Sequence, residues 1–149
     1  MSEDEKWMMI SINEANKAAN ENEIPVGAII VKDNKLIAKA HNQSILKNDP
    51  TAHAEIQLLR SAGKKLQNYR LLGSTVYVTL EPCAMCLGAM VHARINRLVY
   101  GAHDPKTGVC GSCEDLSNAN FFKHKISITG GVLKKNCGQL LQDFFKSRR

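Results

Sequence analysis

Apolar residues recur at helical spacing near both ends of the chain. They are Trp7, Ile10, Ala15, Ala18 and Ala19 in the first stretch, and Cys137, Leu140, Leu141, Phe144 and Phe145 in the second. Ser2 and Glu5 stand three residues apart in front of the first stretch, where a capping box would start a helix. The pattern therefore predicts an amphipathic helix at each end of the chain.

Short runs rich in branched and aromatic residues predict strands between these helices. The runs cover residues 27–31, 36–40, 75–79, 98–100 and 126–129. Asp33 and Asn34, between the first two runs, suit a hairpin turn. Strands separated by helices predict an α/β protein in which helices cover a central sheet. We therefore expect one domain over residues 1–149, a three-layer α/β/α sandwich with a mixed sheet.

Two short motifs carry candidate chemistry. His53 stands two residues before Glu55, and Cys83 stands three residues before Cys86. Zinc prefers tetrahedral sites with nitrogen and sulfur ligands, and a site with only three protein ligands leaves a position for water. We therefore predict one catalytic zinc ion per subunit, held by His53, Cys83 and Cys86, with Glu55 beside it as the catalytic acid and base.

Proline residues indicate where the two helices that carry these motifs begin. Pro82 is predicted at the first helical position before the cysteines, and Asp49-Pro50-Thr51 is predicted to open the helix that holds His53. The positive end of a helix favours thiolates, the form of cysteine that binds zinc. Both helix starts are expected near strand ends, where open α/β sheets bind their ligands.

Composition agrees with a compact enzyme. The chain has 149 residues, 44% of them hydrophobic, which is enough for one buried core. Twenty basic side chains against fourteen acidic ones leave a net charge of +6, which favours a polyanionic partner. Five cysteines without an apolar signal segment suggest the cytoplasm, and no run is long enough to predict a membrane span.

Further segments with a recognisable pattern extend along nearly the whole chain. They are Ile24–Ala28, His41-Asn42, Asp49–Glu55, Tyr77–Cys83, Gly101-Ala102, Asp104, Lys106–Gly108, Gly111-Ser112 and Asp143–Phe145. With these segments the chain resembles the bacterial tRNA-specific adenosine deaminases, which have the cytidine deaminase-like fold. The zinc motif is common to that whole superfamily of nucleobase deaminases. The segment from Asp104 to Ser112 and the Asp-Phe-Phe end indicate the tRNA enzymes.

The resemblance implies a reaction and a partner. The reaction is hydrolytic deamination of the wobble adenosine to inosine in a tRNA anticodon loop, with Glu55 moving the protons and ammonia leaving. The tRNA is chiefly an arginine tRNA, and the enzyme is a homodimer. The resemblance also implies substrate contacts at Val26, Asn42, Asp104, Lys106, Phe145 and Arg149.

Each of these contacts has a plainer explanation from the residues alone. Asn42 fits an ordinary strand end, Val26 fits the core and Lys106 fits a solvated surface. The helical spacing of Phe145 is a sufficient reason for burial. The role of His103 in the substrate loop stays open.

Two rival functions follow from the same sequence. Cys110-Gly111-Ser112-Cys113 is a second pair at the same spacing, so four cysteines would make a structural zinc site in a non-enzymatic RNA-binding protein. That model leaves His53 and Glu55 without a purpose. In the second rival function, the protein uses the same zinc chemistry to deaminate free guanine, cytosine or another small base. The Asp104–Gly108 loop and the basic end 146–149 argue against this function, because a small neutral substrate would not require them.

Overall fold

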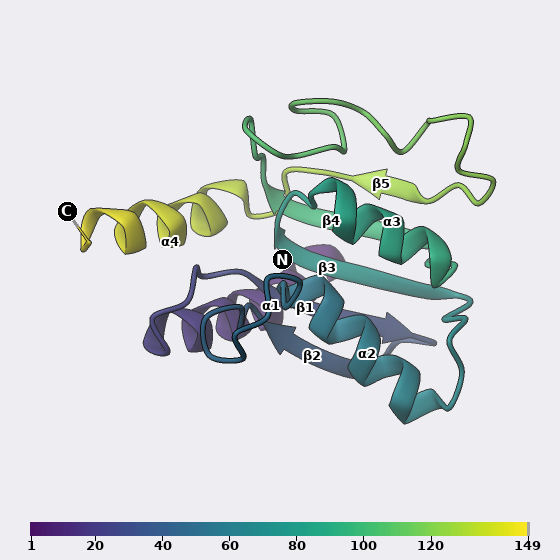
Figure 1. Ribbon diagram of the computed structural model, residues 1–149, viewed down its shortest axis with the longest axis horizontal. Coiled ribbons are helices and arrows are strands. Elements are labelled where there is room, and N and C mark those ends of the chain that lie inside the picture. Colours follow the sequence, from purple (N-terminus) through teal and green to yellow (C-terminus); the bar gives the residue numbers. More distant parts are fainter. Residues whose placement is uncertain (149) are drawn as a thin grey trace.

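The computed structural model describes residues 1–148 and contains one mixed sheet with helices on both faces (Figure 1). The elements are α1 (Glu3–Asn20), β1 (Gly27–Lys32), β2 (Lys35–His41), α2 (Ala54–Leu66), β3 (Ser74–Leu80), α3 (Ala84–His92), β4 (Arg97–Ala102), β5 (Ser127–Thr129) and α4 (Lys134–Lys146). The strand order is β2-β1-β3-β4-β5. Strand β1 is antiparallel to both of its neighbours, whereas β3, β4 and β5 are parallel.

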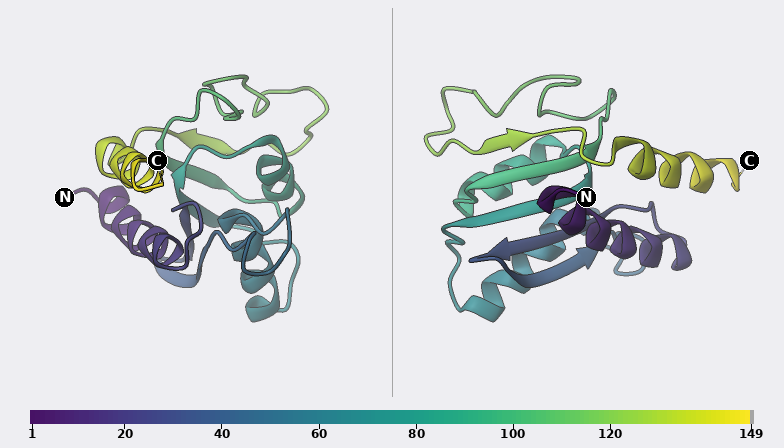
Figure 2. Two further views of the ribbon diagram at one scale, coloured as in Figure 1. Left: turned by 60° about the vertical axis from the view of Figure 1, so that its left-hand side comes forward. Right: turned by 180° about the vertical axis from the view of Figure 1, so that it is seen from behind.

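Two hydrophobic cores lie on opposite faces of the sheet. Helices α2 and α3 pack on one face, where Leu58 and Met90 are fully buried. Helices α1 and α4 lie side by side on the other face, where Met8 and Cys137 are buried (Figure 2). The predicted three-layer α/β/α sandwich with a mixed sheet is thus confirmed. None of the four described helices has the length and hydropathy of a transmembrane span.

Local sequence signals explain several boundaries. The predicted capping box is present, because Ser2 Oγ accepts from the Glu5 backbone N–H and Glu5 Oε1 accepts from the Ser2 N–H. Asp33 and Asn34 both have positive φ, 51° and 59°, as a two-residue type I′ hairpin requires. At Gly27 a Cβ atom would lie 2.1 Å from the Ser11 carbonyl oxygen, so only glycine lets α1 lie this close to β1.

The helices that carry the motifs start later than predicted. Helix α2 starts at Ala54 with His53 as its N-cap, and Asp49-Pro50-Thr51 lies in the preceding loop. The Asp49 carboxylate accepts hydrogen bonds there from the backbone and hydroxyl of Thr51, which favours a turn over a helix. Helix α3 starts at Ala84 with Cys83 as its N-cap, so Pro82 precedes the cap and does not occupy the first helical position.

The topology brings several loops to one edge of the sheet. Strands β2, β3 and β4 point the same way, because β1 is antiparallel to β2 and β3 and β4 is parallel to β3. Their carboxyl ends therefore meet at the edge where β1 begins. Asn42, Glu81 and His103 directly follow these three strands, and Val26 directly precedes β1. The candidate functional residues gather at this edge.

Candidate active site

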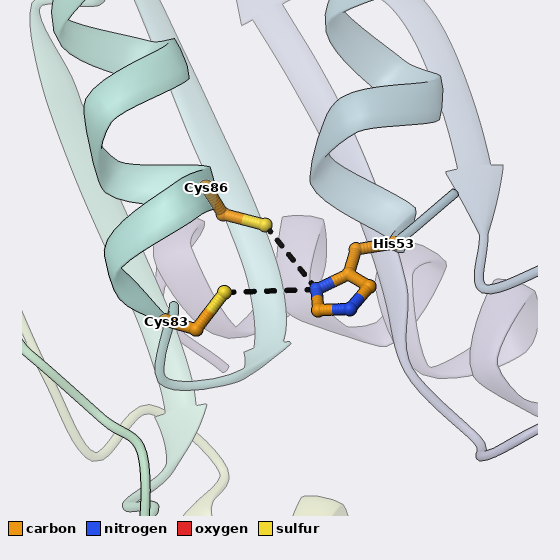
Figure 3. Close-up of side chains that lie close together, drawn as sticks. All are labelled: His53, Cys83 and Cys86. Carbon is orange, nitrogen blue, oxygen red and sulfur yellow. Dashed lines mark hydrogen bonds between the residues drawn. The ribbon is translucent and has the colours of Figure 1, made fainter. Parts of the chain in front are cut away.

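Three metal-ligand side chains converge where α2 and α3 begin. Figure 3 shows His53 and both cysteines pointing toward one another across the gap between the two helix starts. The Nδ1 atom of His53 is 3.7 Å from Cys83 Sγ and 3.5 Å from Cys86 Sγ. All three ligand atoms lie within 4.8 Å of one another. Two helix N-termini thus deliver one nitrogen and two sulfur donors to a single point.

The two sulfur atoms differ in their affinity for protons. A hydrogen bond from Cys86 lowers the pKa of the Cys83 thiol to about 4 against the effect of burial, and His53 contributes further. The same hydrogen bond, together with burial, raises the pKa of Cys86. Zinc binds the thiolate form of cysteine, which is favoured at Cys83.

The donor set fits zinc. One imidazole nitrogen and two cysteine sulfurs are ligands that zinc accepts in tetrahedral sites, and three protein ligands match the open catalytic type. Among residues 1–148, no other group of three such side chains lies close enough to hold a metal ion. Cys110 and Cys113 are not part of the group, and Cys113 is exposed. The geometry therefore gives no support to the four-cysteine rival.

Glu55 lies in the first turn of α2, beside the metal ligands but outside their group. Only 5% of its surface is exposed, and burial raises the pKa of its carboxyl group to about 7. A carboxyl group with such a pKa exchanges protons readily near neutral pH. The site therefore combines a metal-ligand set with an acid–base group.

A cavity of about 200 Å³ opens beside these residues. Its lining includes His53, Glu55 and Cys83 from the metal side. This volume lies below the range of about 300–1,000 Å³ typical of pockets that enclose a drug-sized ligand. The cavity is thus suited to a flat group such as one base.

The structure brings only some of the expected substrate residues to this cavity. Val26, Asn42 and Asp104 line it. Lys106 is exposed and lies outside the lining, on the same loop as Asp104. Phe145 lies on α4, also outside the lining. Arg149 lies outside the described residues.

The two phenylalanines of α4 have different environments. Phe144 is 9% exposed and Phe145 is 48% exposed, with the two rings 5.5 Å apart in an edge-on arrangement. Phe144 also lies under the guanidinium of Arg148, 3.8 Å from its ring centroid. Phe144 therefore contributes to the buried side of α4, whereas Phe145 is available for contact with a partner.

Sequence reasoning missed several residues of the cavity. Ile24, Glu81 and Thr107 belong to its lining. Each lies inside a segment that carries the family resemblance, but residue type gave no signal, because an isoleucine, a strand-end glutamate and a loop threonine have many ordinary roles. Their positions depend on contacts between distant parts of the chain.

Comparison with known proteins identifies the family. A family model described as MafB19-like deaminase matches residues 2–149. The tRNA-specific adenosine deaminase of Haemophilus influenzae is 51% identical over 147 residues, which cover 98% of this chain and 85% of the relative. The chain belongs to the tRNA-specific adenosine deaminase family. The Bacillus subtilis member of that family is 42% identical over 149 residues, 100% of this chain and 92% of the relative.

Solved structures agree with this family assignment. A structure from a study of A-to-I editing by tRNA:A34 deaminases at the wobble position has a TM-score of 0.89 and 39% identity, and covers 91% of this chain and 99% of its own. A guanine deaminase from Nitrosomonas europaea has a TM-score of 0.82 over 97% of this chain and 85% of its own, but only 22% identity. The second likeness shows the cytidine deaminase-like fold alone, so the fold does not distinguish the two substrates.

Proposed function

We propose that this enzyme catalyses the hydrolytic deamination of the wobble adenosine in a tRNA anticodon loop to inosine, with release of ammonia. The observation that carries the proposal is the convergence of His53, Cys83 and Cys86 beside the buried Glu55, in a cavity of base size. Membership of the tRNA-specific adenosine deaminase family supports the substrate.

His53, Cys83 and Cys86 would hold one zinc ion per subunit. Zinc bound there would lower the pKa of a coordinated water, so that a nucleophile is available near neutral pH. The position of the ligands at the starts of α2 and α3 supports this role, because the positive end of a helix stabilises a thiolate. The rigid helices also keep the three donors at fixed positions.

Glu55 moves the protons of the proposed reaction. Its carboxylate accepts one proton from the attacking water and delivers it to the ring nitrogen beside carbon 6. It then accepts the second proton from the hydroxyl group on carbon 6 and delivers it to the departing amine. The carbon–oxygen bond forms first and makes carbon 6 tetrahedral, and the carbon–nitrogen bond then breaks so that ammonia leaves. Burial of Glu55 excludes bulk water from these transfers, which keeps the protons between the two reactants.

Val26 and Asn42 would bind the base inside the cavity. Val26 is 9% exposed and offers an apolar surface on which a flipped adenine packs. The Oδ1 atom of Asn42 accepts a hydrogen bond from Ser44, which leaves the amide nitrogen as a donor for the nucleoside. Asp104 lies across the same cavity and would contact the anticodon loop.

Exposed groups outside the cavity would bind the rest of the anticodon stem-loop. Lys106 and the basic end with Arg149 supply positive charge for phosphates, and Phe145 supplies an exposed ring for stacking. An arginine tRNA is the proposed main substrate. The cytoplasm is the proposed location, because tRNA is found there and none of the five cysteines is in a disulfide.

A homodimer is the proposed assembly. The surface between the carboxyl-terminal parts of α2 and α3 is hollowed into an apolar groove of about 740 Å³, away from the metal ligands. Ile56, Leu59, Tyr69 and Ala89 belong to its lining, and Tyr69 is 73% exposed. An exposed apolar patch of this kind marks a protein interface. Sedimentation of the wild type and a Leu59→Glu variant tests whether a second copy covers the groove.

A substrate competition tests the proposed reaction. Zinc-loaded protein is offered an anticodon stem-loop with adenosine at the wobble position, and in parallel free adenosine, cytidine and guanine. We expect inosine in the stem-loop at a far higher kcat/KM than any product from the small substrates, because an unpaired loop base costs little to extrude. A stem-loop with the adenosine moved into the duplex stem is the matched control. Rapid conversion of guanine or cytosine without inosine in RNA would establish the free-base rival.

A further inference from the structure

Glu81 is a fully buried carboxylate that the proposed reaction does not use. It directly follows β3 and stands two residues before Cys83. Its side chain has no exposed surface, although it lies in the lining of the base cavity. A buried carboxylate is costly unless hydrogen bonds replace its lost hydration. The groups that provide those bonds indicate what Glu81 does.

All of these hydrogen bonds come from one segment, Asp104 to Ser112. Glu81 Oε1 accepts from the Asp104 backbone N–H at 3.1 Å. Its other oxygen, Oε2, accepts from the backbone N–H groups of Cys110 at 2.9 Å and Ser112 at 3.1 Å. The Ser112 hydroxyl also donates to Oε1. One carboxylate thus binds both ends of a loop that lies 23 to 31 residues later in the chain.

The middle of the same loop is shaped to let the carboxylate in. A Cβ atom at Gly108 would lie 2.5 Å from the Glu81 carboxyl carbon and 2.5 Å from the Asp104 carbonyl oxygen. Real Cβ atoms essentially never approach heavy atoms so closely. Glycine at position 108 is therefore required for the loop to wrap around Glu81.

The bound loop forms one wall of the base cavity. Asp104 and Thr107 both line the cavity next to Glu81. The Asp104 carboxylate accepts from the backbone N–H groups of Lys106 at 3.0 Å and Thr107 at 3.2 Å, and from the Thr107 hydroxyl at 2.8 Å. Asp104 thus shapes the tip of the loop, while Glu81 attaches that tip to the end of β3.

We infer that Glu81 is a positioning residue that holds the segment Asp104–Ser112 as the wall of the base cavity and keeps Lys106 at its rim for the RNA backbone. This inference rests on the proposed function. Because Glu81 and Cys83 belong to the same short run after β3, the metal ligand and the substrate loop share one rigid support. The fixed loop lowers the entropy lost on RNA binding.

The Glu81→Gln variant tests this role with little change in size. Its amide places N–H groups against the donors of Asp104, Cys110 and Ser112, so the loop loses acceptors. We expect faster hydrogen exchange at these three amides and an unchanged zinc content. The KM for the anticodon stem-loop should rise about tenfold, the effect of losing hydrogen bonds to a charged group. We expect kcat to change much less than KM.

Asp4→Asn is the matched control for general destabilisation. Asp4 also carries a partly buried carboxylate, which pairs with Arg97 at 2.7 Å and accepts from Tyr77, but it lies on α1 and is absent from the cavity lining. This variant should lower the melting temperature while leaving KM and the exchange of the 104–112 segment unchanged. An equal rise of KM in both variants would overturn the inference, because KM would then report stability alone.

The Gly108→Ala variant tests the same contact without removing the carboxylate. The added methyl group must push the loop from Glu81, so KM should rise and exchange at Cys110 and Ser112 should increase as in Glu81→Gln. Gly138→Ala is its control, because a Cβ atom at that helical position meets no atom within 4 Å beyond its chain neighbours and the backbone of its own helix. Unchanged loop exchange in both Glu81→Gln and Gly108→Ala would refute the positioning role.

Failure of the proposed function would look different. If the wild type forms no inosine but deaminates a free base, the proposed RNA substrate is wrong. The KM of the variants for that base then measures the effect of the cavity wall on substrate binding. Loop exchange and zinc content are measured without turnover, so they report on Glu81 in either case. Whatever the substrate, unchanged exchange of the loop in both Glu81→Gln and Gly108→Ala contradicts the inference.

Discussion

The chain contains two Cys-x-x-Cys segments with the same spacing and different structures. Cys83 caps α3 and Cys86 lies in its first turn, so both sulfurs point toward His53 (Figure 3). Cys110 and Cys113 lie in the loop after β4, where the first is buried and the second is exposed. The backbone N–H of Cys110 donates to Glu81. One pair converges on a third ligand, and the other lies at the end of the loop that Glu81 binds, outside the cavity lining.

The ionisation of the thiols differs in the same way. The hydrogen bond from Cys86 lowers the pKa of Cys83 to about 4, whereas burial raises the pKa of Cys110 to about 12. A thiolate is the ligand that zinc needs, so Cys83 favours metal binding and Cys110 does not. Spacing alone therefore does not predict a metal site. A helix N-terminus and a third donor on a neighbouring element make the difference.

Removing one sulfur from the first pair should have the largest effect. Cys83→Ala or Cys86→Ala leaves two protein ligands, so bound zinc should fall from about one per chain to near zero, with loss of activity. Elemental analysis of the purified variants measures the metal. Circular dichroism checks that the fold persists, because loss of zinc in an unfolded chain says nothing about the ligands. A variant that keeps a full zinc ion would remove Cys83 or Cys86 from the ligand set.

The next largest effect separates proton transfer from metal binding within the same site. Glu55→Ala should retain about one zinc ion per chain, because Glu55 is not in the ligand group. Deamination should fall by about 10⁴-fold, the upper range for a general acid and base, because one residue serves several transfers. Single-turnover kinetics on the stem-loop measure the rate. Near-normal turnover in a zinc-replete variant would contradict the assigned role.

A smaller effect on RNA binding is expected at Lys106, in the loop that also holds Cys110 and Cys113. Lys106→Ala should weaken RNA binding and make the dependence of log K on log salt shallower by about 1, as for one lost phosphate contact. Zinc content and the melting temperature should stay unchanged, because Lys106 is exposed. Fluorescence anisotropy at several salt concentrations gives the slope. Lys123→Ala, another exposed lysine of the loop before β5, is the control. An equal change of slope in both variants would mean that the attraction is not specific to the rim.

The smallest expected effect concerns the chemistry of the second pair. Alkylation of Cys110 should be slow and should accelerate about tenfold for each pH unit between pH 7 and 10, because its pKa of about 12 keeps the reactive thiolate a minor form throughout. Cys113 should react first, because it is exposed. Peptide mass spectrometry follows each site separately. A Cys110 rate that levels off below pH 9 would show that burial does not control this thiol.

Local patterns predicted most of the fold. Runs of β-branched and aromatic residues predicted the strands. Asp33 and Asn34 predicted the hairpin turn, and Ser2 with Glu5 predicted the start of the first helix. These signals act between residues close in the chain. Proline proved less reliable, since Pro50 and Pro82 both lie before their helices rather than inside them. A proline limits φ at its own position, but it does not set how soon a helix follows.

The site shows the limits of the same reasoning. His53, Cys83 and Cys86 were predicted as a group because few chemistries use that set of side chains, and the structure brings them together. Helical spacing was a sufficient reason to expect burial of Phe145, but the structure buries Phe144 and leaves Phe145 48% exposed. The contacts of Glu81 join residues 23 to 31 positions apart, and no local period records them. Such contacts appear only when the sheet assembles.

The most direct test of this account measures inosine and zinc together in the double variant Cys110→Ala/Cys113→Ala. If His53, Cys83 and Cys86 hold the catalytic metal, this protein should bind about one zinc ion per chain. It should also convert the wobble adenosine of an anticodon stem-loop to inosine, within about a factor of ten of the wild-type rate, because neither cysteine belongs to the ligand group or to the cavity lining. Loss of both zinc and inosine formation in a folded double variant would contradict the account and favour a site built from four cysteines.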